Sequence, residues 1–245
     1  MGLIGSGGSI LSIPILVYCF GVTPEVATTH SLFIVGITAI IASYKHYKLG
    51  HLKVDVALVF SVPSVIALLL TRKYLLPAIP SIIYSNGNFV LEKHHLMMGL
   101  FSLLMMASAI YMIRNRHSNQ GNKPSRLKLF FIAIAVGFVT GLLGAGGGFL
   151  IVPALLVYAK LEVKSAIATS LTIITLNCLI GFIGDLINDV PFNKMLLIKV
   201  SVMAFAGLLI GIALSRKTNG EKLKPVFGWF VLIMGLFIII KEFFT

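Results

Sequence analysis

The sequence predicts an all-α, polytopic transmembrane helical bundle made of two inverted repeats with glycine-broken helices or hairpins. Three observations predict this fold: the composition, the lengths of the apolar segments and an internal repeat. Of the 245 residues, 58% are hydrophobic and 11% are charged, and the mean hydropathy is +0.99. A soluble domain carries about 25% charged residues. The composition therefore excludes an ordinary soluble enzyme, a disordered chain and a collagen-like fibre.

Long apolar segments follow one another along the chain, with short polar segments between them. A helix needs about 20 apolar residues to cross a bilayer. Six segments reach or nearly reach that length, and they are residues 26–44, 54–71, 95–113, 163–184, 195–215 and 225–240. Residues 8–20 form a shorter apolar segment. Residues 73–93 contain two prolines and an Asn-Gly-Asn sequence, and we expect them to lie on the membrane surface.

The apolar segment 127–158 is too long for one straight crossing. At about 1.5 Å per residue it would reach roughly 48 Å, whereas the hydrocarbon core is about 30 Å thick. A glycine-rich sequence occupies its middle, at residues 141–148. Glycines at this density break a helix. We therefore expect a hairpin that enters and leaves the membrane on one face.

The two halves of the chain align without a gap when they are shifted by 139 positions. Eleven of the 31 positions from 2 to 32 are then identical. Membrane composition explains matched leucines, but it does not explain glycines and a proline that match in order. These matches are Gly2, Gly5, Gly7, Gly8 and Pro14 with Gly141, Gly144, Gly146, Gly147 and Pro153. An internal repeat follows.

The longest polar stretch divides the chain into two parts. We predict a first transmembrane repeat at 1–114, a cytoplasmic linker at 115–126 and a second transmembrane repeat at 127–245. In the alignment Met1 falls opposite Thr140, so the apolar segment before Thr140 has no counterpart in the first half. The first half is then expected to lack its first helix. Either the chain is truncated or its start was assigned late, or this half uses half a hairpin.

The basic residues predict which loops face the cytoplasm. If residues 127–158 form a hairpin, one side of the membrane holds 14 of the 20 Lys and Arg residues and the other holds six. With a single crossing the division becomes 11 to nine. Positively charged loops remain on the cytoplasmic side, so the hairpin is favoured. The cytoplasmic loops are then 45–53, 114–128, 160–164 and 216–224, and the two halves are inverted, as in many secondary transporters.

The glycine segments are the first candidate substrate site. Each precedes a short helix whose free N–H groups and positive dipole end would face the break. Two inverted repeats would bring these ends together near the midplane, where they would attract an anion. The alternative is that the glycines only permit close helix packing. The candidate residues are Gly5, Ser6, Gly7, Gly8 and Ser9 in the first half and Gly144, Gly146, Gly147 and Gly148 in the second.

A second pair of matched segments lies at the start of the following helices. Residues 28–31 (Thr-Thr-His-Ser) align with residues 167–170 (Ile-Ala-Thr-Ser). Their hydroxyl groups would contact a substrate oxygen, or would cap a helix or bind a neighbouring helix. His30 would titrate during transport or would simply hydrogen-bond a neighbour, and the polar Asn177 has the same two interpretations. The candidates here are His30, Ser31, Thr169, Ser170 and Asn177.

The eight acidic residues lie at or near the ends of the apolar spans. We therefore find no obvious carboxylate for a buried proton relay. The sequence contains no zinc-ligand spacing, no phosphate-binding loop with its lysine and no nucleophile elbow. We expect no enzyme activity, no metal site and no cofactor. The net charge of +12 is attributed to cytoplasmic loops beside an anionic leaflet, not to nucleic-acid binding.

The two glycine motifs are long enough for comparison with known families. The first is Gly-Ser-Gly-Gly-Ser-Ile-Leu-Ser-Ile-Pro at residues 5–14, and the second is Gly-Ala-Gly-Gly-Gly-Phe-Leu-Ile-Val-Pro at residues 144–153. Each is followed by Ala-x-x-(Thr or His)-Ser-Leu. This pair resembles the motifs of the sulfite exporter TauE/SafE family of membrane permeases, over essentially the whole chain. The resemblance implies a multi-pass protein of a bacterial-type inner membrane that moves sulfite, sulfonates or related organosulfur anions.

The expected function is that of a secondary transporter, or permease. It would move a small sulfur-containing anion such as sulfite or an organosulfonate by alternating access around a midplane site. One alternative is an anion channel, whose flux would not saturate. Another is a membrane assembly or interaction protein that transports nothing and has a stable partner. The expected partners are the small anion and membrane lipid, and a homo-oligomer is compatible with the sequence.

Overall fold

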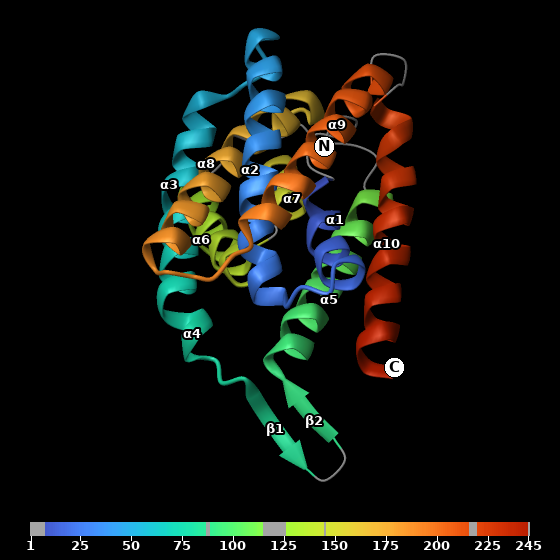
Figure 1. Cartoon of the computed structure of the whole chain (residues 1–245). Coiled ribbons are helices and arrows are strands. Elements are labelled where there is room, and N and C mark those ends of the chain that lie inside the picture. The colour runs from blue at the N-terminus through green and yellow to red at the C-terminus, as the bar shows by residue number, and fades with distance from the viewer. Residues whose placement is uncertain (1–7, 87–88, 115–125, 145, 216–219, 245) are drawn as a thin grey trace.

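The computed structural model describes residues 8–86, 89–114, 126–144, 146–215 and 220–244. These residues are almost entirely helical, and their one sheet is a two-stranded antiparallel hairpin. Figure 1 shows a bundle of long helices with the β-hairpin projecting from its lower end. The expected all-α bundle is confirmed.

The first half of the chain contains the β-hairpin. Its elements are α1 (Gly8–Pro14), the π-helical turn η1 (Ile15–Cys19), α2 (Pro24–Lys48), α3 (Val54–Leu70), the π-helical turn η2 (Thr71–Leu75), α4 (Leu76–Ala78), β1 (Ile82–Asn86), β2 (Phe89–Glu92) and α5 (Lys93–Arg114). The expectation that residues 73–93 lie on the membrane surface is corrected for residues 73–78, which continue an apolar membrane-length helix. Helix continues from α3 through α4, and the hairpin then extends beyond the bundle (Figure 1).

The second half is helical throughout its described residues. Its elements are α6 (Arg126–Leu143), α7 (Gly148–Tyr158), α8 (Val163–Ile187), α9 (Lys194–Ser215) and α10 (Gly220–Phe244). Five helices in the described part of the chain are long and apolar enough to cross a membrane. They are α2, the continuous helix Val54–Ala78, α6, α8 and the segment Lys194–Gly211 of α9.

Helices α2 and α8 show that the matched segments run in opposite directions. Their bounds differ by 139 residues at both ends, which is the shift of the sequence repeat. Thr29 Oγ1 donates a hydrogen bond to Asp185 Oδ2 at 2.8 Å, near one end of the pair. Ser43 Oγ lies 2.7 Å from Thr172 Oγ1, near the other end. The two helices are therefore antiparallel, as the inverted repeat requires.

Helices α6 and α7 form the expected hairpin. The glycines of α6 lie against α3, with Gly137 facing Ser64 and Gly141 facing Leu68, so α6 runs parallel to α3. Helix α7 then returns, and the chain enters α8 close to the α2–α3 loop. There the Lys53 backbone N–H donates to Thr169 Oγ1 at 3.2 Å. The hairpin thus begins and ends on the side that holds the loops 45–53 and 160–164.

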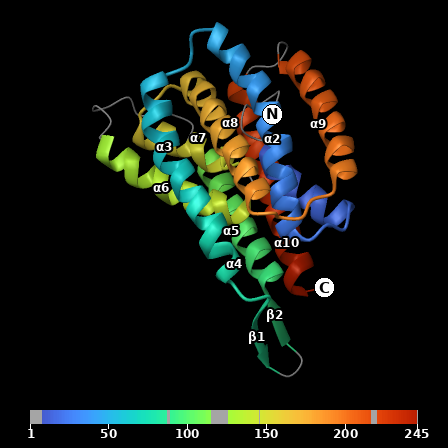
Figure 2. The same cartoon turned by 60° about the vertical axis from the view of Figure 1, so that its left-hand side comes forward.

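The two halves share one core. Helix α2 packs on α8, α3 packs on α6 and α8, and α5 packs on α10. Figure 2 shows α3, α6 and α8 side by side, with α9 on the outer side of α2. The division at residues 115–126 stays a prediction, because residues 115–125 lie outside the described part of the chain.

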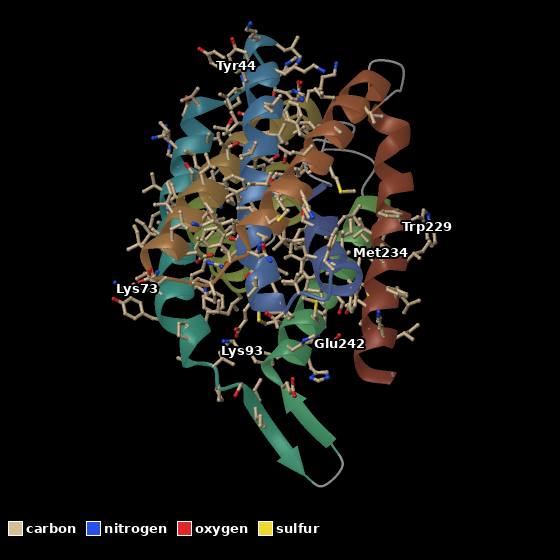
Figure 3. All side chains as sticks on the ribbon, in the orientation of Figure 1. Tyr44, Lys73, Lys93, Trp229, Met234 and Glu242 are labelled. Atoms are coloured by element: carbon tan, nitrogen blue, oxygen red, sulfur yellow. The ribbon has the colours of Figure 1, made fainter. Side chains whose placement is uncertain are left out.

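Large apolar side chains cover the outside of the bundle. On α9 and α10 they include Met195, Ile198, Val202, Trp229 and Ile233, each more than half exposed. Figure 3 shows Trp229 on the outward side of α10. Lipid tails are as apolar as these side chains, so the surface suits a hydrocarbon environment.

Candidate substrate site

The chain between α6 and α7 turns at glycines that no other residue replaces easily. Gly144, Gly146 and Gly147 have φ angles of +63°, +65° and +68°, a region that L side chains rarely adopt. A Cβ on Gly144 would lie 2.2 Å from Thr28 Cβ, and one on Gly147 would lie 2.2 Å from Thr140 Cγ2. Both the backbone conformation and the close packing of this glycine loop, made of Gly144, Gly146 and Gly147, therefore require glycine.

The glycine loop lies at the depth of the helix centres. A Cβ on Gly146 would lie 2.6 Å from Cys178 Sγ and 3.0 Å from Val35 Cγ1. Val35 and Cys178 are close to the middles of α2 and α8. Helix α7 starts from this loop, with Gly147 as its N-cap. Its first turn therefore begins inside the bundle, where a dipole end is poorly solvated.

A buried ion pair lies beside the end of α6. Arg72 in η2 pairs with Asp185 in α8, and each side chain is 3% exposed. Arg72 Nε donates to Asp185 Oδ1 at 2.5 Å, and Arg72 Nη2 donates to Asp185 Oδ2. Arg72 Nη1 donates to the Gly141 carbonyl at 3.2 Å, and Thr29 Oγ1 donates to Asp185 Oδ2 at 2.8 Å. One guanidinium thus joins segments from η2, α8, α2 and α6.

Thr28 connects the ion pair to the glycine loop. Arg72 Nη2 lies 3.4 Å from Thr28 Oγ1 and 3.1 Å from Thr29 Oγ1. Thr28 is also the residue against which Gly144 packs. A displacement of the guanidinium would therefore act directly on the turn between α6 and α7.

Neither Asp185 nor Arg72 is among the site residues predicted from the sequence. Asp185 lies near the end of α8, as expected, but it is 2% exposed, and Arg72 is 6% exposed. Residues near a helix end become buried when a neighbouring helix continues past them, and here η2 extends α3 beside α8. A signal was present, because Arg72 and Asp185 each directly follow an apolar span, at 54–71 and 163–184. Charged residues in such positions usually pair with each other.

The glycines predicted as a binding site are only partly described. Gly5, Ser6 and Gly7 lie outside the described residues, and Gly8 and Ser9 begin α1. In the second half, Gly144, Gly146, Gly147 and Gly148 are all buried. Packing and backbone conformation account for the first three of these, and their role in binding stays a prediction.

Three predicted residues lie in the buried part of the α2–α8 pair. His30 Nδ1 lies 2.7 Å from the Val26 carbonyl, and its Nε2 lies 3.2 Å from the Asn193 carbonyl. Ser31 Oγ is buried and has no hydrogen-bond partner among the described residues. Asn177 Nδ2 donates to Ser64 Oγ at 2.6 Å, while its buried Oδ1 has no partner in the described part of the chain. The last two side chains retain a free polar atom inside the bundle.

Thr169 and Ser170 lie at the other end of the pair. Thr169 Oγ1 accepts from the Lys53 backbone, and Ser170 Oγ donates to the Ile167 carbonyl at 2.9 Å. Ser31 is 12 residues before Ser43, which faces Thr172, and that is roughly 18 Å of helix. The structure therefore does not bring Ser31 together with Thr169 and Ser170 in one site.

A cavity of about 370 Å³ lies between α1, η1, α2 and α9. Its lining is mostly apolar, and it includes Ile34, Val35 and Thr38 of α2 and Gly207 of α9. Val35 also packs against Gly146, so the cavity and the glycine loop lie on two sides of one side chain.

A further polar cluster joins the ends of α5 and α10, just outside the apolar spans. His94 Nε2 lies 2.8 Å from Glu242 Oε1, and Tyr18 Oη donates to Glu242 Oε2 at 3.1 Å. The hydrogen bond to Glu242 raises the pKa of His94, although partial burial opposes this. Burial raises the pKa of Glu242, but the hydrogen bond and charge of His94 outweigh it, so the pKa is lowered overall. Figure 3 shows Glu242 near the lower end of α10.

Comparison with known proteins gives consistent matches along the chain. The family model described as sulfite exporter TauE/SafE matches residues 1–238. A probable membrane transporter protein of Methanocaldococcus jannaschii is 28% identical over 97% of this chain and 90% of its own length. Another from Xylella fastidiosa is 30% identical over 98% and 89%, and the YunE protein of Bacillus subtilis is 25% identical over 99% and 93%. No solved structure matches this chain significantly.

Proposed function

Since the chain belongs to the sulfite exporter TauE/SafE family, we propose that it carries a small sulfur-containing anion, such as sulfite or an organosulfonate, by alternating access. The chain is a multi-pass integral membrane transporter, as its relatives are named and as the five long apolar helices among its described residues indicate. The family and the relatives' names indicate a transporter and not an enzyme.

The observation that carries this proposal is the glycine loop at the depth of the helix centres. Helix α7 starts there with its N-terminal end inside the bundle. The first N–H groups of a helix have no partner within the helix and favour an anion. In the proposal, the corresponding glycines of the first half (Gly5, Gly7 and Gly8) supply the second such end from the inverted repeat.

The hydroxyl groups take two separate places in this mechanism. Ser31 is near the end of the α2–α8 pair that holds Asp185, whereas Thr169 and Ser170 are near the end that holds Lys53. We assign Ser31 to the outward-open site and Thr169 and Ser170 to the inward-open site. Asn177 precedes Cys178, whose side chain lies against Gly146 of the glycine loop. In the proposal, Asn177 contacts the anion in both states.

Flux measurements in liposomes test the proposal. The purified chain is reconstituted, and uptake of labelled sulfite, methanesulfonate, taurine, sulfoacetate and sulfate is measured. We expect saturable uptake of a sulfur anion that falls strongly in a Ser31→Ala variant and in a Thr169→Ala/Ser170→Ala variant. Ser81→Ala, at an exposed position before β1, is the matched control.

The other outcomes separate the alternatives. Uptake that rises linearly with concentration and shows no exchange would indicate an anion channel. Folded protein that carries none of the four anions, nor zwitterionic taurine, would contradict the proposal. Unchanged saturable uptake in both hydroxyl variants would leave a transporter but remove these side chains from its site.

A further inference from the structure

The Arg72–Asp185 pair has few charged neighbours. Four elements surround it, and every other Asp, Glu, Lys or Arg in the described parts of α2, α3, α6 and α8 lies in a first or last helical turn. From η2 the neighbouring Lys73 is exposed, and Figure 3 shows it at the outer edge of the bundle. From α2, His30 is hydrogen-bonded to the Val26 and Asn193 carbonyls. Arg72 and Asp185 therefore compensate each other's charge.

A buried ion pair is energetically costly as a contact between these helices. The desolvation penalty of two buried charges often exceeds their attraction, so apolar residues of the same size hold helices together equally well. Ionisable groups within membrane segments usually mark a substrate or ion pathway. The pair also sits beside the glycine loop, since Thr28 contacts both Arg72 and Gly144. Its position therefore suits a role in the transport step.

The guanidinium has the shape that an oxyanion requires. Its Nε and Nη2 groups point in parallel at the two oxygens of Asp185, and the same fork binds two oxygens of a sulfonate or sulfite. The hydroxyls of Thr28 and Thr29 lie within 3.4 Å of Nη2, where they can turn toward a bound anion. Asp185 thus occupies the position of an anionic ligand.

Charge balance decides what happens when an anion arrives. The pair is neutral as it stands, and a monoanion added beside an ionised Asp185 would leave one uncompensated negative charge in a low-dielectric region. Such a charge is strongly disfavoured, so the site regains neutrality when one proton enters with the anion. A protonated Asp185 beside an anion-bound Arg72 restores neutrality.

We propose that Arg72 binds the transported anion, that Asp185 holds its place when no anion is bound, and that one proton travels with each monoanion. The inference rests on the proposed function and names its coupling ion. A proton from the water on the entry side adds to an Asp185 oxygen and breaks the ion pair. The anion then accepts hydrogen bonds from Nε and Nη2 of Arg72. On the exit side the anion leaves, Asp185 returns its proton to water, and the ion pair forms again.

Anion accumulation in liposomes at clamped membrane potential tests this coupling. The probe is labelled methanesulfonate, which is a monoanion at every pH used, or labelled sulfite if methanesulfonate is not carried. With an acidic exterior, we expect the unmodified protein to accumulate the anion against its gradient. Asp185→Asn imitates the protonated carboxyl, so it should still exchange anion for anion but should no longer accumulate it. A Glu25→Gln/Lys93→Gln variant, which removes the partly exposed Glu25–Lys93 ion pair away from Arg72, should behave like the unmodified protein.

A double variant keeps the test valid if Asp185→Asn leaves Arg72 uncompensated and unfolds the protein. Arg72→Gln/Asp185→Asn buries no charge and is expected to fold, as thermal unfolding in detergent would show. It lacks the guanidinium, so anion binding should be about 10- to 100-fold weaker. Wild-type affinity in this variant would remove Arg72 from the site.

The results also separate this inference from the proposed function. Saturable anion flux without accumulation under a pH gradient would overturn proton coupling and leave the transporter intact. Accumulation by Asp185→Asn at the unmodified rate would do the same. If the folded, unmodified protein shows no saturable flux of any of the anions, both proposals fall.

Discussion

Helices α3 and α9 occupy corresponding places in the two halves, yet their surroundings differ. Ser64 and Leu68 of α3 are fully buried, because α6 lies against them. The same shift of 139 residues leads to Met203 and Gly207 on α9. Met203 is 67% exposed, and a Cβ on Gly207 would meet nothing within 4 Å. Among the described residues, no helix packs on α9 as α6 packs on α3.

The polar network shows the same asymmetry. Arg72 and Asp185 form the buried ion pair, but their repeat mates are Gly211 and His46. The matching backbone of α2 and α8 therefore does not imply matching chemistry. An inverted repeat keeps helix order and length and reverses helix direction, while the residues that carry charge are free to differ between its copies.

Removing the charge of Arg72 from η2, which continues α3, should have the largest effect on stability. Arg72→Met leaves Asp185 buried and uncompensated, and we expect a loss of about 3–5 kcal/mol in the free energy of unfolding. The double variant Arg72→Met/Asp185→Leu should recover most of that loss. Replacing the neighbouring exposed Lys73 by Met should change little. Chemical unfolding in detergent measures all three, and equal losses in the single and double variants would contradict the assignment.

A pair of glycines tests the packing difference directly. Gly137→Ala places a Cβ 2.2 Å from the backbone oxygen of Ser64, whereas Gly207→Ala places one in open space. Both residues are helical, so both gain about 1 kcal/mol of helix propensity. We expect Gly137→Ala to lower the melting temperature because α6 must move away from α3, and Gly207→Ala to raise it slightly. Equal shifts would mean that the two helices are packed alike.

Chemical labelling should distinguish the same two faces without a change in stability. In a Cys19→Ser background, which removes the exposed native thiol, Met203→Cys should react readily with a maleimide in detergent. Ser64→Cys should remain unlabelled until the protein unfolds, because Ser64 is buried. Labelling at both positions in the folded protein would remove the contrast between α3 and α9.

The smallest effect on stability is expected at the contact of α5 with α10, where one helix from each half packs on the other. The raised pKa of His94 gives a stabilisation that is present below its unfolded value of 6.5 and is lost as pH rises. The lowered pKa of Glu242 gives one that is present above 4.5 and is lost as pH falls. The contribution should therefore be greatest between about pH 4.5 and 6.5. Melting temperatures of the unmodified protein and His94→Gln across pH should differ most in that window.

Much of the fold follows from the sequence because hydrophobicity and repetition act over whole segments. The aligned glycines predicted the repeat, the long glycine-broken segment predicted the α6–α7 hairpin, and the basic residues predicted the inversion. The structure gives α2 and α8 equal lengths at the predicted shift. The β-hairpin was not predicted, since strand pairing depends on a few residues outside the apolar spans. The repeat also explains why Ser31 and Ser170 lie apart, because inversion sends matched residues away from the midplane to opposite ends.

The ion pair depends on information of another kind. Arg72 and Asp185 are 113 residues apart, and neither the repeat nor the local pattern relates them. Only the packing of η2 beside α8 brings them together. Arg72 and Asp185 can be selected from the sequence because each is a charged residue beside an apolar span. Their hydrogen bonds to Thr29 and Gly141 cannot be predicted in this way.

The same separation has a consequence for biosynthesis. Arg72 is made 113 residues before its partner, which at 5–20 residues per second corresponds to roughly 6–23 s of translation. During that time the arginine has no carboxylate to accompany it into the bilayer. The nascent α3 must therefore wait at the interface or beside the insertion machinery until α8 emerges. A ribosome stalled before residue 185 would leave a chain that cellular quality control should recognise by its unpaired arginine.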